Sequence, residues 1–152
     1  MDSAASTQTH QSVLDRMNRY YTEQRCNVNR GDFRISQEVS ADMEKARESF
    51  ANLINAKPEQ IMFTAGATEG LNMVADWCKD VPVVIITEAE HTANILPWIA
   101  QGRTVDNGRL VVLPVNDRGS LNYDECAKIF EKWPYALLLS LIHISEPTRL
   151  AT

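Results

Sequence analysis

Three small residues, Gly66, Ala67 and Thr68, form a short corner between an apolar run and a segment with helical spacing. They lie within FTAGATEGLN, residues 63–72. If the corner joins a strand to a helix, the helix start presents unpaired N–H groups and a partial positive charge, which favour an anion such as phosphate. Gly66 lets the chain turn sharply and approach that anion closely. Ala67 leaves its own amide uncovered, and Thr68 adds a hydroxyl donor, so the corner predicts a phosphate site.

The same corner also has a purely structural explanation. Gly66 would make a tight turn, and the Thr68 side chain would cap the helix. Two glycines four residues apart are a weak motif, and the stretch matches neither a P-loop nor a GxGxxG sequence. These residues alone favour neither explanation.

A second polar stretch, TEAEHTANILPW at residues 87–98, follows an apolar run at residues 83–86. Ligands of open α/β sheets bind beyond the carboxyl ends of the strands, so we expect His91 to lie at the same sheet edge as Thr68. Its imidazole could stack on a planar heteroaromatic ligand or move protons. A lone histidine is more often an ordinary surface or core residue. Two polar loops at one edge nevertheless favour a binding site.

The elements that must position these loops alternate along the chain. Short apolar runs predict strands, and amphipathic spacing predicts helices. The expected strands cover residues 61–64, 83–86, 110–113 and 136–139. One expected helix presents an apolar face at residues 71–78. A second covers residues 94–101, with Pro97 in its first turn. A third runs from a capping box at 122–125 to about 132. This order predicts an α/β fold with a largely parallel sheet and flanking helices.

The first sixty residues carry a different pattern. Apolar side chains recur at helical spacing over residues 13–21 and again over 39–54. A turn-like segment, CNVNRGDF at 26–33, separates the two predicted helices. Pro58 is expected to end the second helix, because the residue before a proline is disfavoured in the helical region.

Composition limits the classes of function. The 152 residues, 44% hydrophobic and 23% charged, are typical of one globular domain, and a net charge of −5 does not support nucleic-acid or anionic-membrane binding. Prolines and charges interrupt every apolar run short of a membrane span, and no signal segment opens the chain. Cys26, Cys78 and Cys126 lack disulfide or metal spacing, which predicts free thiols in a cytoplasmic protein without a metal site.

Four stretches together resemble one known family. They are DSAA at 2–5, NVNRG at 27–31, FTAGATEGLN at 63–72 and EHTANILPW at 90–98. In this order they are similar to the amino-terminal part of SufS-type cysteine desulfurases, of the class V aminotransferase group of fold-type I pyridoxal phosphate enzymes. The resemblance covers about residues 1–138. It implies a truncated large domain with a mainly parallel sheet, a cytoplasmic homodimer, an amino-acid substrate and a sulfur-acceptor protein.

The resemblance also implies roles for particular residues. Gly66, Ala67 and Thr68 would hold the phosphate of pyridoxal 5′-phosphate, and His91 would stack on its pyridine ring. The pair at 29–30, Asn29 and Arg30, would lie near the active-site entrance. Where many members carry arginine, threonine, histidine and a second histidine, this chain has Ala65, Ala67, Asn29 and Thr92. Losing the hydroxyl at Ala67 would weaken phosphate binding modestly, and the other departures bear on the substrate more than on the cofactor.

The family reaction converts cysteine to alanine and leaves the sulfur on the enzyme as a persulfide, for iron–sulfur cluster assembly. In the family, the lysine that forms a Schiff base with the cofactor, the nucleophilic cysteine and the aspartate at the pyridine nitrogen come later than the matched part. The lysines and cysteines of this chain match none of these positions, so we expect no catalytic residue here and an inactive fragment. The alternatives are another class V enzyme, such as a selenocysteine lyase or an epimerase, and a truncated binding domain without catalysis.

The last residues stand apart from this resemblance. The string LSLIHISEPTR at 139–149 resembles the conceptual translation of a sequencing-library adapter. We therefore expect three parts: an amino-terminal arm and helix at 1–30, a partial cofactor-binding large domain at 31–138, and a non-native tail at 139–152. On this interpretation His143, Glu146 and Arg149 carry no function.

Overall fold

The computed structural model describes residues 7–140. The chain forms two compact units, Met1–Phe63 and Thr64–Thr152. The DSAA stretch and the tail residues His143, Glu146 and Arg149 lie outside the described residues. The predicted division into three parts also states that residues 139–152 are non-native. The two compact units do not test that statement, so the three-part division stays a prediction.

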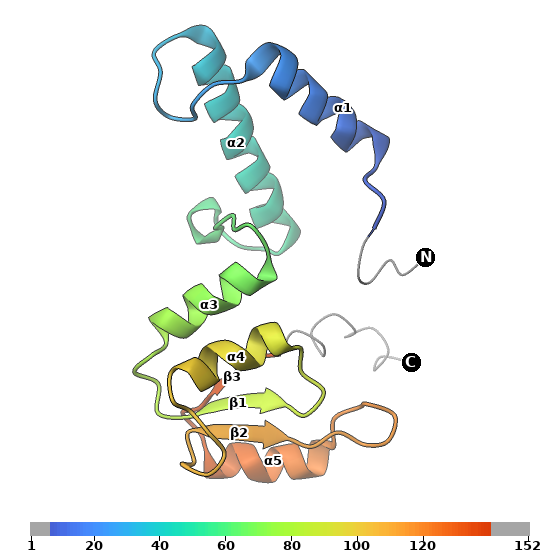
Figure 1. Ribbon diagram of the computed structural model, residues 1–152, viewed down its shortest axis with the longest axis vertical. Helices are drawn as coiled ribbons and strands as arrows, with labels where there is room; N and C mark the ends of the chain where they lie inside the picture. The colour runs from blue at the N-terminus through green and yellow to red at the C-terminus, as the bar shows by residue number, and fades with distance from the viewer. Residues whose placement is uncertain (1–6, 141–152) are drawn as a thin grey trace. The chain divides into compact units, whose positions relative to one another are not determined.

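The first unit is helical. It contains α1 (Gln11–Arg19), a π-helical turn η1 (Tyr20–Gln24), α2 (Arg34–Leu53) and a 3₁₀ turn η2 (Pro58–Gln60), as labelled in part in Figure 1. Both predicted helices and the turn-like segment between them are confirmed. No helix within residues 7–140 is long and apolar enough to cross a membrane.

The end of α2 corrects one expectation. The helix stops at Leu53, well before Pro58, because Asn55 adopts a left-handed conformation with φ 54°. The Ala56 N–H donates to the Ala51 carbonyl at 2.8 Å, and the Asn55 N–H donates to the Asn52 carbonyl at 3.4 Å. These two bonds form a Schellman motif, which satisfies the last carbonyls of the helix. Pro58 instead opens η2.

The second unit is an α/β layer. Strand β1 (Val84–Thr87) lies between β2 (Leu110–Leu113) and β3 (Leu137–Leu138), and both pairings are parallel. The helices are α3 (Ala67–Trp77), α4 (Thr92–Ala100) and α5 (Tyr123–Lys132). This arrangement confirms the predicted α/β class and the parallel sheet.

The sheet is covered on both faces, with α3 and α4 on one side and α5 on the other (Figure 1). Every residue of β1 is buried, as a β-branched run in a central parallel strand predicts. One core cluster combines β1 and β2 with the inner sides of α3 and α4: Ala75, Val84, Ile86, Trp98 and Leu110. The other faces α5: Val83, Ile85, Leu113 and Cys126.

The cysteines are free thiols, as predicted. Cys126 is buried against the sheet and behaves as a small apolar side chain. Burial raises the pKa of its thiol, because the thiolate would lose solvation there.

Two predicted elements differ from the structure. Residues 61–64 form no strand, because no described strand pairs with them and both sides of β1 are occupied by β2 and β3. Pro97 is the sixth residue of α4 and not in its first turn, since the helix already begins at Thr92 behind the cap His91. Its missing N–H costs one helical hydrogen bond, and its ring is buried.

The start of α5 confirms half of the predicted capping box. The Asn122 side chain accepts a hydrogen bond from the Glu125 N–H at 3.4 Å. The reciprocal bond does not form, because the Asn122 N–H donates to the Pro114 carbonyl at 3.4 Å. The turn before it closes at Gly119, whose φ of 75° suits glycine.

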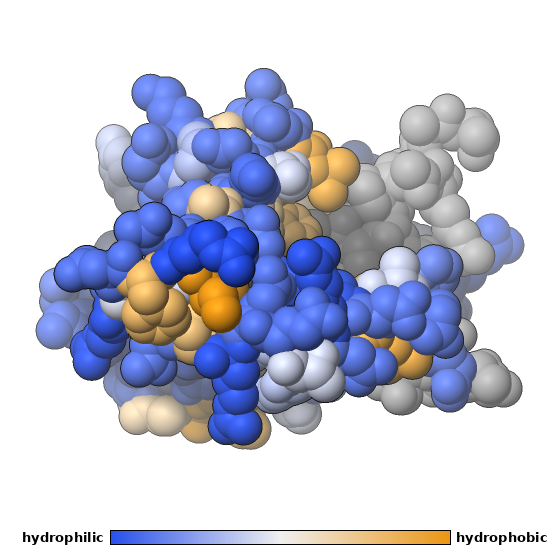
Figure 2. All heavy atoms as spheres, turned by 90° about the horizontal axis from the view of Figure 1, so that it is seen from above, coloured by the Kyte–Doolittle hydropathy of each residue, from blue (hydrophilic) through white to orange (hydrophobic). Residues whose placement is uncertain are grey.

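Exposed apolar surface leads to a first prediction, that the isolated chain associates in solution. In the described sheet, β2 and β3 each have one unpaired edge, and large apolar groups reach the surface, including Phe130, Tyr135 and Leu138. Apolar side chains also emerge among hydrophilic ones on the face drawn in Figure 2. Unpaired edges and apolar patches promote association. Sedimentation velocity should show oligomers that increase with concentration, whereas a monodisperse monomer with one cooperative melting transition would contradict this.

Candidate functional site

The small-residue corner lies at the start of α3. Gly66 is the residue before the helix, and no side chain caps it. Its backbone is extended (φ 166°, ψ 179°), so the position does not require the left-handed conformation that favours glycine. What glycine provides is space, because a Cβ built there has no atom within 4 Å. The expectation of a sharp glycine turn is therefore replaced by an open, uncovered approach to the helix start.

The first amides of α3 are available to a ligand. The first helical hydrogen bond runs from the Gly70 N–H to the Gly66 carbonyl at 3.1 Å. Among residues 7–140, no acceptor contacts the N–H groups of Ala67, Thr68 or Glu69, and all three residues are exposed. The Thr68 hydroxyl caps nothing in this described part, so the structural explanation of Thr68 as the helix cap is wrong.

An acidic side chain also stands at this helix start. The Glu69 carboxylate accepts a hydrogen bond from the Ala65 N–H at 2.5 Å. This bond holds the residue before Gly66 against the first turn of α3. Carboxylates are favourable at a helix N-terminus. The Glu69 contact lies on the side of Ala65 and leaves the Ala67 and Thr68 amides uncovered.

His91 has a structural role that the sequence did not reveal. Its Nδ1 accepts a hydrogen bond from the Ala93 N–H at 3.0 Å, which caps α4. His10 caps α1 in the same way, through the Ser12 N–H at 3.3 Å. Because Nδ1 is engaged, Nε2 and the two faces of the exposed His91 ring are the parts left for a ligand.

The two helix starts lie at one edge of the sheet. Helices α3 and α4 run in the same general direction, and both begin on the side toward which the β1 and β2 arrows point (Figure 1). Near their other ends, the Gln101 side chain donates to the Ala75 carbonyl at 2.7 Å. The structure therefore brings the Gly66–Thr68 corner and His91 to the same side of the second unit, at the edge where α/β proteins bind ligands.

Buried polar residues that the sequence analysis did not single out hold the His91 loop. The Glu90 carboxylate accepts from the His91 N–H at 3.2 Å and lies 3.4 Å from the Thr87 hydroxyl. Asn94 is fully buried, and its amide donates to the Leu139 carbonyl at 3.2 Å. Polar residues directly after a buried strand were the available signal, but nothing in their spacing distinguished buried ones from exposed ones.

Asn29 and Arg30 belong to the first unit and are described there. Asn29 adopts a left-handed conformation with φ 57°, and its N–H donates to the Ser40 hydroxyl at 3.0 Å. Arg30 is exposed on the same loop. Within the described ranges, no group of three His, Cys, Asp or Glu side chains is arranged to hold a metal ion.

Comparison with known sequences supports a family assignment. The model of the family "Aminotransferase class-V" matches residues 1–147, a range that extends into the predicted tail. A cysteine desulfurase of Pectobacterium carotovorum is 40% identical over an alignment of 154 positions, which covers 96% of this chain and 37% of that protein. A cysteine desulfurase of Synechococcus elongatus is 37% identical over 135 residues, covering 84% of this chain and 21% of that protein.

Solved structures give the same result. The apo structure of a cysteine desulfurase from Thermococcus onnurineus matches with a TM-score of 0.72 and 32% identity, over 84% of this chain and 32% of that one. A structure named as a NifS-like protein matches with a TM-score of 0.72 and 29% identity, over 84% of this chain and 36% of its own length. The chain thus spans little more than a third of the length of the Pectobacterium enzyme and of the NifS-like protein. By the family model, which matches nearly its whole length, this chain belongs to the class V aminotransferase family.

Proposed function

We propose that this chain is the cofactor-phosphate-binding part of a pyridoxal phosphate-dependent cysteine desulfurase. One relative named as a cysteine desulfurase is 41% identical to it over 130 residues. The proposal includes the SufS-type subclass, a role in supplying sulfur for iron–sulfur clusters, a homodimeric and cytoplasmic whole protein, and a non-native origin of residues 139–152.

The unpaired amides at the start of α3 carry this proposal. Ala67, Thr68 and Glu69 present three N–H donors, and Thr68 adds a hydroxyl. A dianionic phosphate suits such a helix start, because the donors and the helix dipole act together. Each hydrogen bond to a charged group contributes about 1.5–3 kcal/mol. Ala67 stands where a threonine hydroxyl is common, so one neutral donor worth about 1 kcal/mol is absent.

His91 would orient the ring of the cofactor. Its exposed imidazole faces can stack on a flat heteroaromatic ring. The Ala93 N–H donates to Nδ1, which orients the ring and leaves the Nε2–H as a hydrogen-bond donor for a ligand. When bound, pyridoxal phosphate serves as the electron sink for chemistry at the substrate carbon. The part of this chain is to bind and orient that group.

A second prediction concerns activity. Of the lysines, Lys79 follows α3, Lys128 and Lys132 lie on α5, and Lys45 and Lys57 belong to the first unit. None is in the loops that lead into α3 and α4, so none is suited to hold the cofactor covalently. We expect the 152-residue chain to form no alanine from L-cysteine above a protein-free blank that contains pyridoxal phosphate. Steady formation of alanine by the chain would contradict this part of the proposal.

A third prediction tests the phosphate site directly. Pyridoxine 5′-phosphate has no aldehyde and cannot react with surface lysines, so its binding reports non-covalent contacts alone. We expect equilibrium dialysis to show at least tenfold weaker binding of pyridoxine, which lacks the phosphate, because two or more charge-assisted hydrogen bonds are lost. Equal binding of pyridoxine 5′-phosphate and pyridoxine would contradict the proposed function.

Matched variants separate the two parts of the site. Thr68→Val should weaken pyridoxine 5′-phosphate about tenfold, whereas Thr22→Val, in the first unit, should leave binding unchanged. His91→Asn keeps a side chain that caps helices well but removes the ring. This variant should retain α4 and weaken both ligands by a similar factor, since both carry the pyridine ring.

A further inference from the structure

The connection between α4 and β2 is held together by one asparagine side chain. The Asn107 Oδ1 accepts hydrogen bonds from the Thr104 N–H at 3.0 Å and from the Arg109 N–H at 3.1 Å. Its Nδ2 donates to the Gly102 carbonyl at 2.8 Å. The Asn107 N–H in turn donates to the Thr104 hydroxyl at 3.2 Å. This side chain therefore links the end of α4 to the residue before β2, and residues 102–110 are called the Asn107 turn below.

Backbone hydrogen bonds complete the Asn107 turn. The Gly108 N–H donates to the Val105 carbonyl at 3.0 Å. The Leu110 N–H, at the first residue of β2, donates to the Thr104 carbonyl at 3.2 Å. Gly108 has a φ of 69°, which glycine adopts without strain. A Cβ built at Gly108 has no atom within 4 Å, so the conformation and not the space is what favours glycine there.

Asn107 and Gly108 form the one Asn-Gly pair of the sequence. Asparagine is a thermolabile residue, and glycine after it leaves the backbone nitrogen open to approach the side-chain carbonyl carbon. Attack joins the Gly108 nitrogen to the Asn107 Cγ in a five-membered succinimide. The bond from Cγ to Nδ2 breaks, and Nδ2 leaves as ammonia with the amide proton of Gly108. Water then opens the ring at either carbonyl and gives aspartate or isoaspartate, so one water is consumed and one ammonia is released.

The native turn opposes this reaction. Attack requires the Gly108 nitrogen to lie about 3–3.5 Å from the Asn107 Cγ and to face the side-chain amide. Hydrogen bonds at both Oδ1 and Nδ2 fix the orientation of that amide, and the bond to the Val105 carbonyl holds the Gly108 N–H. Each bond of this kind contributes about fivefold to an equilibrium constant, so opening two of them lowers the reactive population by more than about tenfold.

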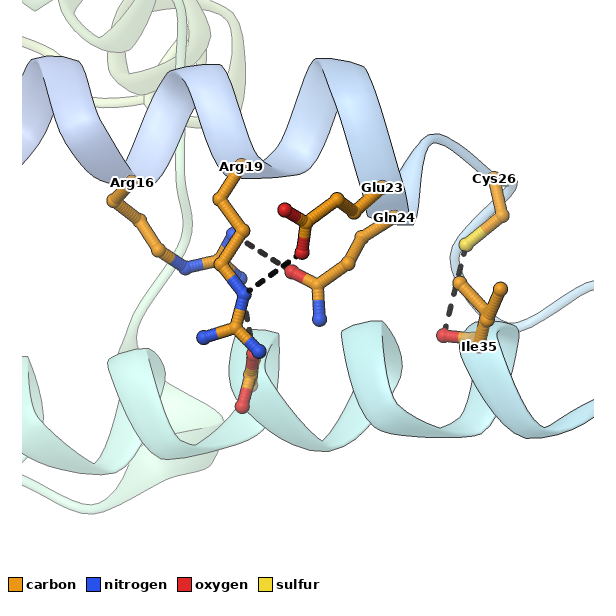
Figure 3. A network of polar contacts seen from close by, with 7 residues as sticks. Arg16, Arg19, Glu23, Gln24, Cys26 and Ile35 are labelled. Carbon is orange, nitrogen blue, oxygen red and sulfur yellow. Dashed lines mark hydrogen bonds and ion pairs between the residues drawn. The ribbon is translucent and has the colours of Figure 1, made fainter.

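A hydrogen-bonded side-chain amide is not sufficient for this chemistry. Gln24 is buried in the first unit, and its Oε1 accepts a hydrogen bond from Arg16 at 3.0 Å (Figure 3). A glutamine must close a larger, six-membered ring, and the side chain of the following Arg25 hinders the approach of the nitrogen. The glycine after Asn107 is what distinguishes the turn between α4 and β2.

We propose that Asn107 is a site of spontaneous deamidation that the native turn suppresses, so that the modification accumulates when this part of the chain opens. The products cannot rebuild the turn. An aspartate carboxylate has no hydrogen for the Gly102 carbonyl, and an isoaspartate adds a carbon atom to the backbone. All residues concerned belong to the second unit, and the proposal does not depend on a cofactor.

Peptide mapping by mass spectrometry tests the site and localises it. Trypsin cleaves after Arg103 and Arg109, which isolates residues 104–109. The chain is incubated at mildly alkaline pH in buffer and in concentrated urea, and a synthetic peptide of residues 104–109 in each solution gives the intrinsic rate. We expect the chain in buffer to deamidate at least about tenfold more slowly than the peptide, because two or more hydrogen bonds must open. In urea the chain and the peptide should react at the same rate.

A variant decides whether the hydrogen bonds of the turn give this protection. Thr104→Val removes the hydroxyl that accepts from the Asn107 N–H. It should speed deamidation in buffer about fivefold and leave the rate in urea unchanged. A merely destabilised chain would instead show faster hydrogen exchange throughout the second unit, which exchange measured on the same sample reveals.

The effect of the product is measured with Asn107→Asp. This variant should lower the equilibrium constant for folding of the second unit at least about fivefold in urea titrations followed by tryptophan fluorescence. Asn116→Asp is the matched control, because the Asn116 Oδ1 also accepts two backbone N–H groups, while no residue within 7–140 accepts from its Nδ2. The control should change the constant less than about twofold.

Three results would overturn the proposal: deamidation of the chain in buffer at the rate of the peptide, no deamidation in urea, or equal losses of stability in the two aspartate variants. Failure of the phosphate corner before α3 would leave all three measurements unchanged, since none contains a cofactor or phosphate.

Discussion

Replacing Arg103 with alanine is expected to lower the free energy of unfolding of the second unit by about 3–5 kcal/mol. Arg103 is fully buried. Its guanidinium donates to the carbonyls of Cys78, Lys79 and Val81 at 3.3, 2.9 and 2.7 Å. It thereby ties the segment after α3 to the segment after α4. Removal would take these donors away from part-buried carbonyls and create a cavity.

The local chain explains how Arg103 reaches this position. Gly102 ends α4 with a φ of 73°, and the Arg103 N–H donates to the Trp98 carbonyl at 3.1 Å, which completes a Schellman motif. The guanidinium lies 5.8 Å from the Trp98 ring centroid. Burial, and then the positive charge of Arg109, lower the pKa of Arg103, but an arginine stays charged at neutral pH.

Urea unfolding followed by tryptophan fluorescence measures this effect, because Trp77, Trp98 and Trp133 all lie in the second unit. Arg109→Ala is the matched control, since that side chain is exposed, and it should change stability by less than about 0.5 kcal/mol. Arg103→Lys should recover little, because one ammonium cannot reproduce the fork of donors. A loss below about 1 kcal/mol for Arg103→Ala would contradict the role assigned to it.

Replacing Trp98 with alanine should cost about 3–5 kcal/mol of unfolding free energy, typical of a buried tryptophan. The Trp98 side chain is fully buried on α4, in the cluster that joins this helix to α3 and the sheet. Its indole N–H donates to the Asn94 side chain at 3.4 Å, so the polar atom is satisfied inside the core.

Trp77 provides the matched control for this measurement. It lies at the end of α3 and is 63% exposed, so Trp77→Ala should cost less than about 1 kcal/mol. The remaining tryptophans report unfolding in both variants. Similar losses for the two variants would mean that the core of this unit is not centred on Trp98.

Several parts of the fold followed from local patterns. The apolar run at 83–86 and the run at 110–113 became β1 and β2 within one residue, because buried parallel strands require such runs. The predicted strand at 61–64 failed because a strand needs a partner, and apolar residues alone do not supply one. The end of α2 was misplaced because Asn55, and not the more conspicuous Pro58, adopts the conformation that stops the helix.

The sequence analysis named the residues of the candidate site but not the contacts that they make. The sequence indicated that Gly66, Thr68 and His91 would reach one sheet edge, and the helices begin there. It did not reveal that His91 caps α4 through Nδ1, or that Glu90 is buried beneath its backbone. Both depend on side-chain positions that residue spacing does not determine.

Apart from the failed strand at 61–64, the order of strands and helices, the parallel sheet class and the open corner before α3 were determined by the sequence itself, because periodicity and small residues act over a few neighbours. The tertiary structure alone decided which polar groups are buried and which arginines of residues 7–140 pair with a carboxylate. Arg103 and Arg25 look alike in the sequence, yet one is enclosed by carbonyls and the other is exposed. Burial depends on elements distant in the chain, and no local pattern carries that information.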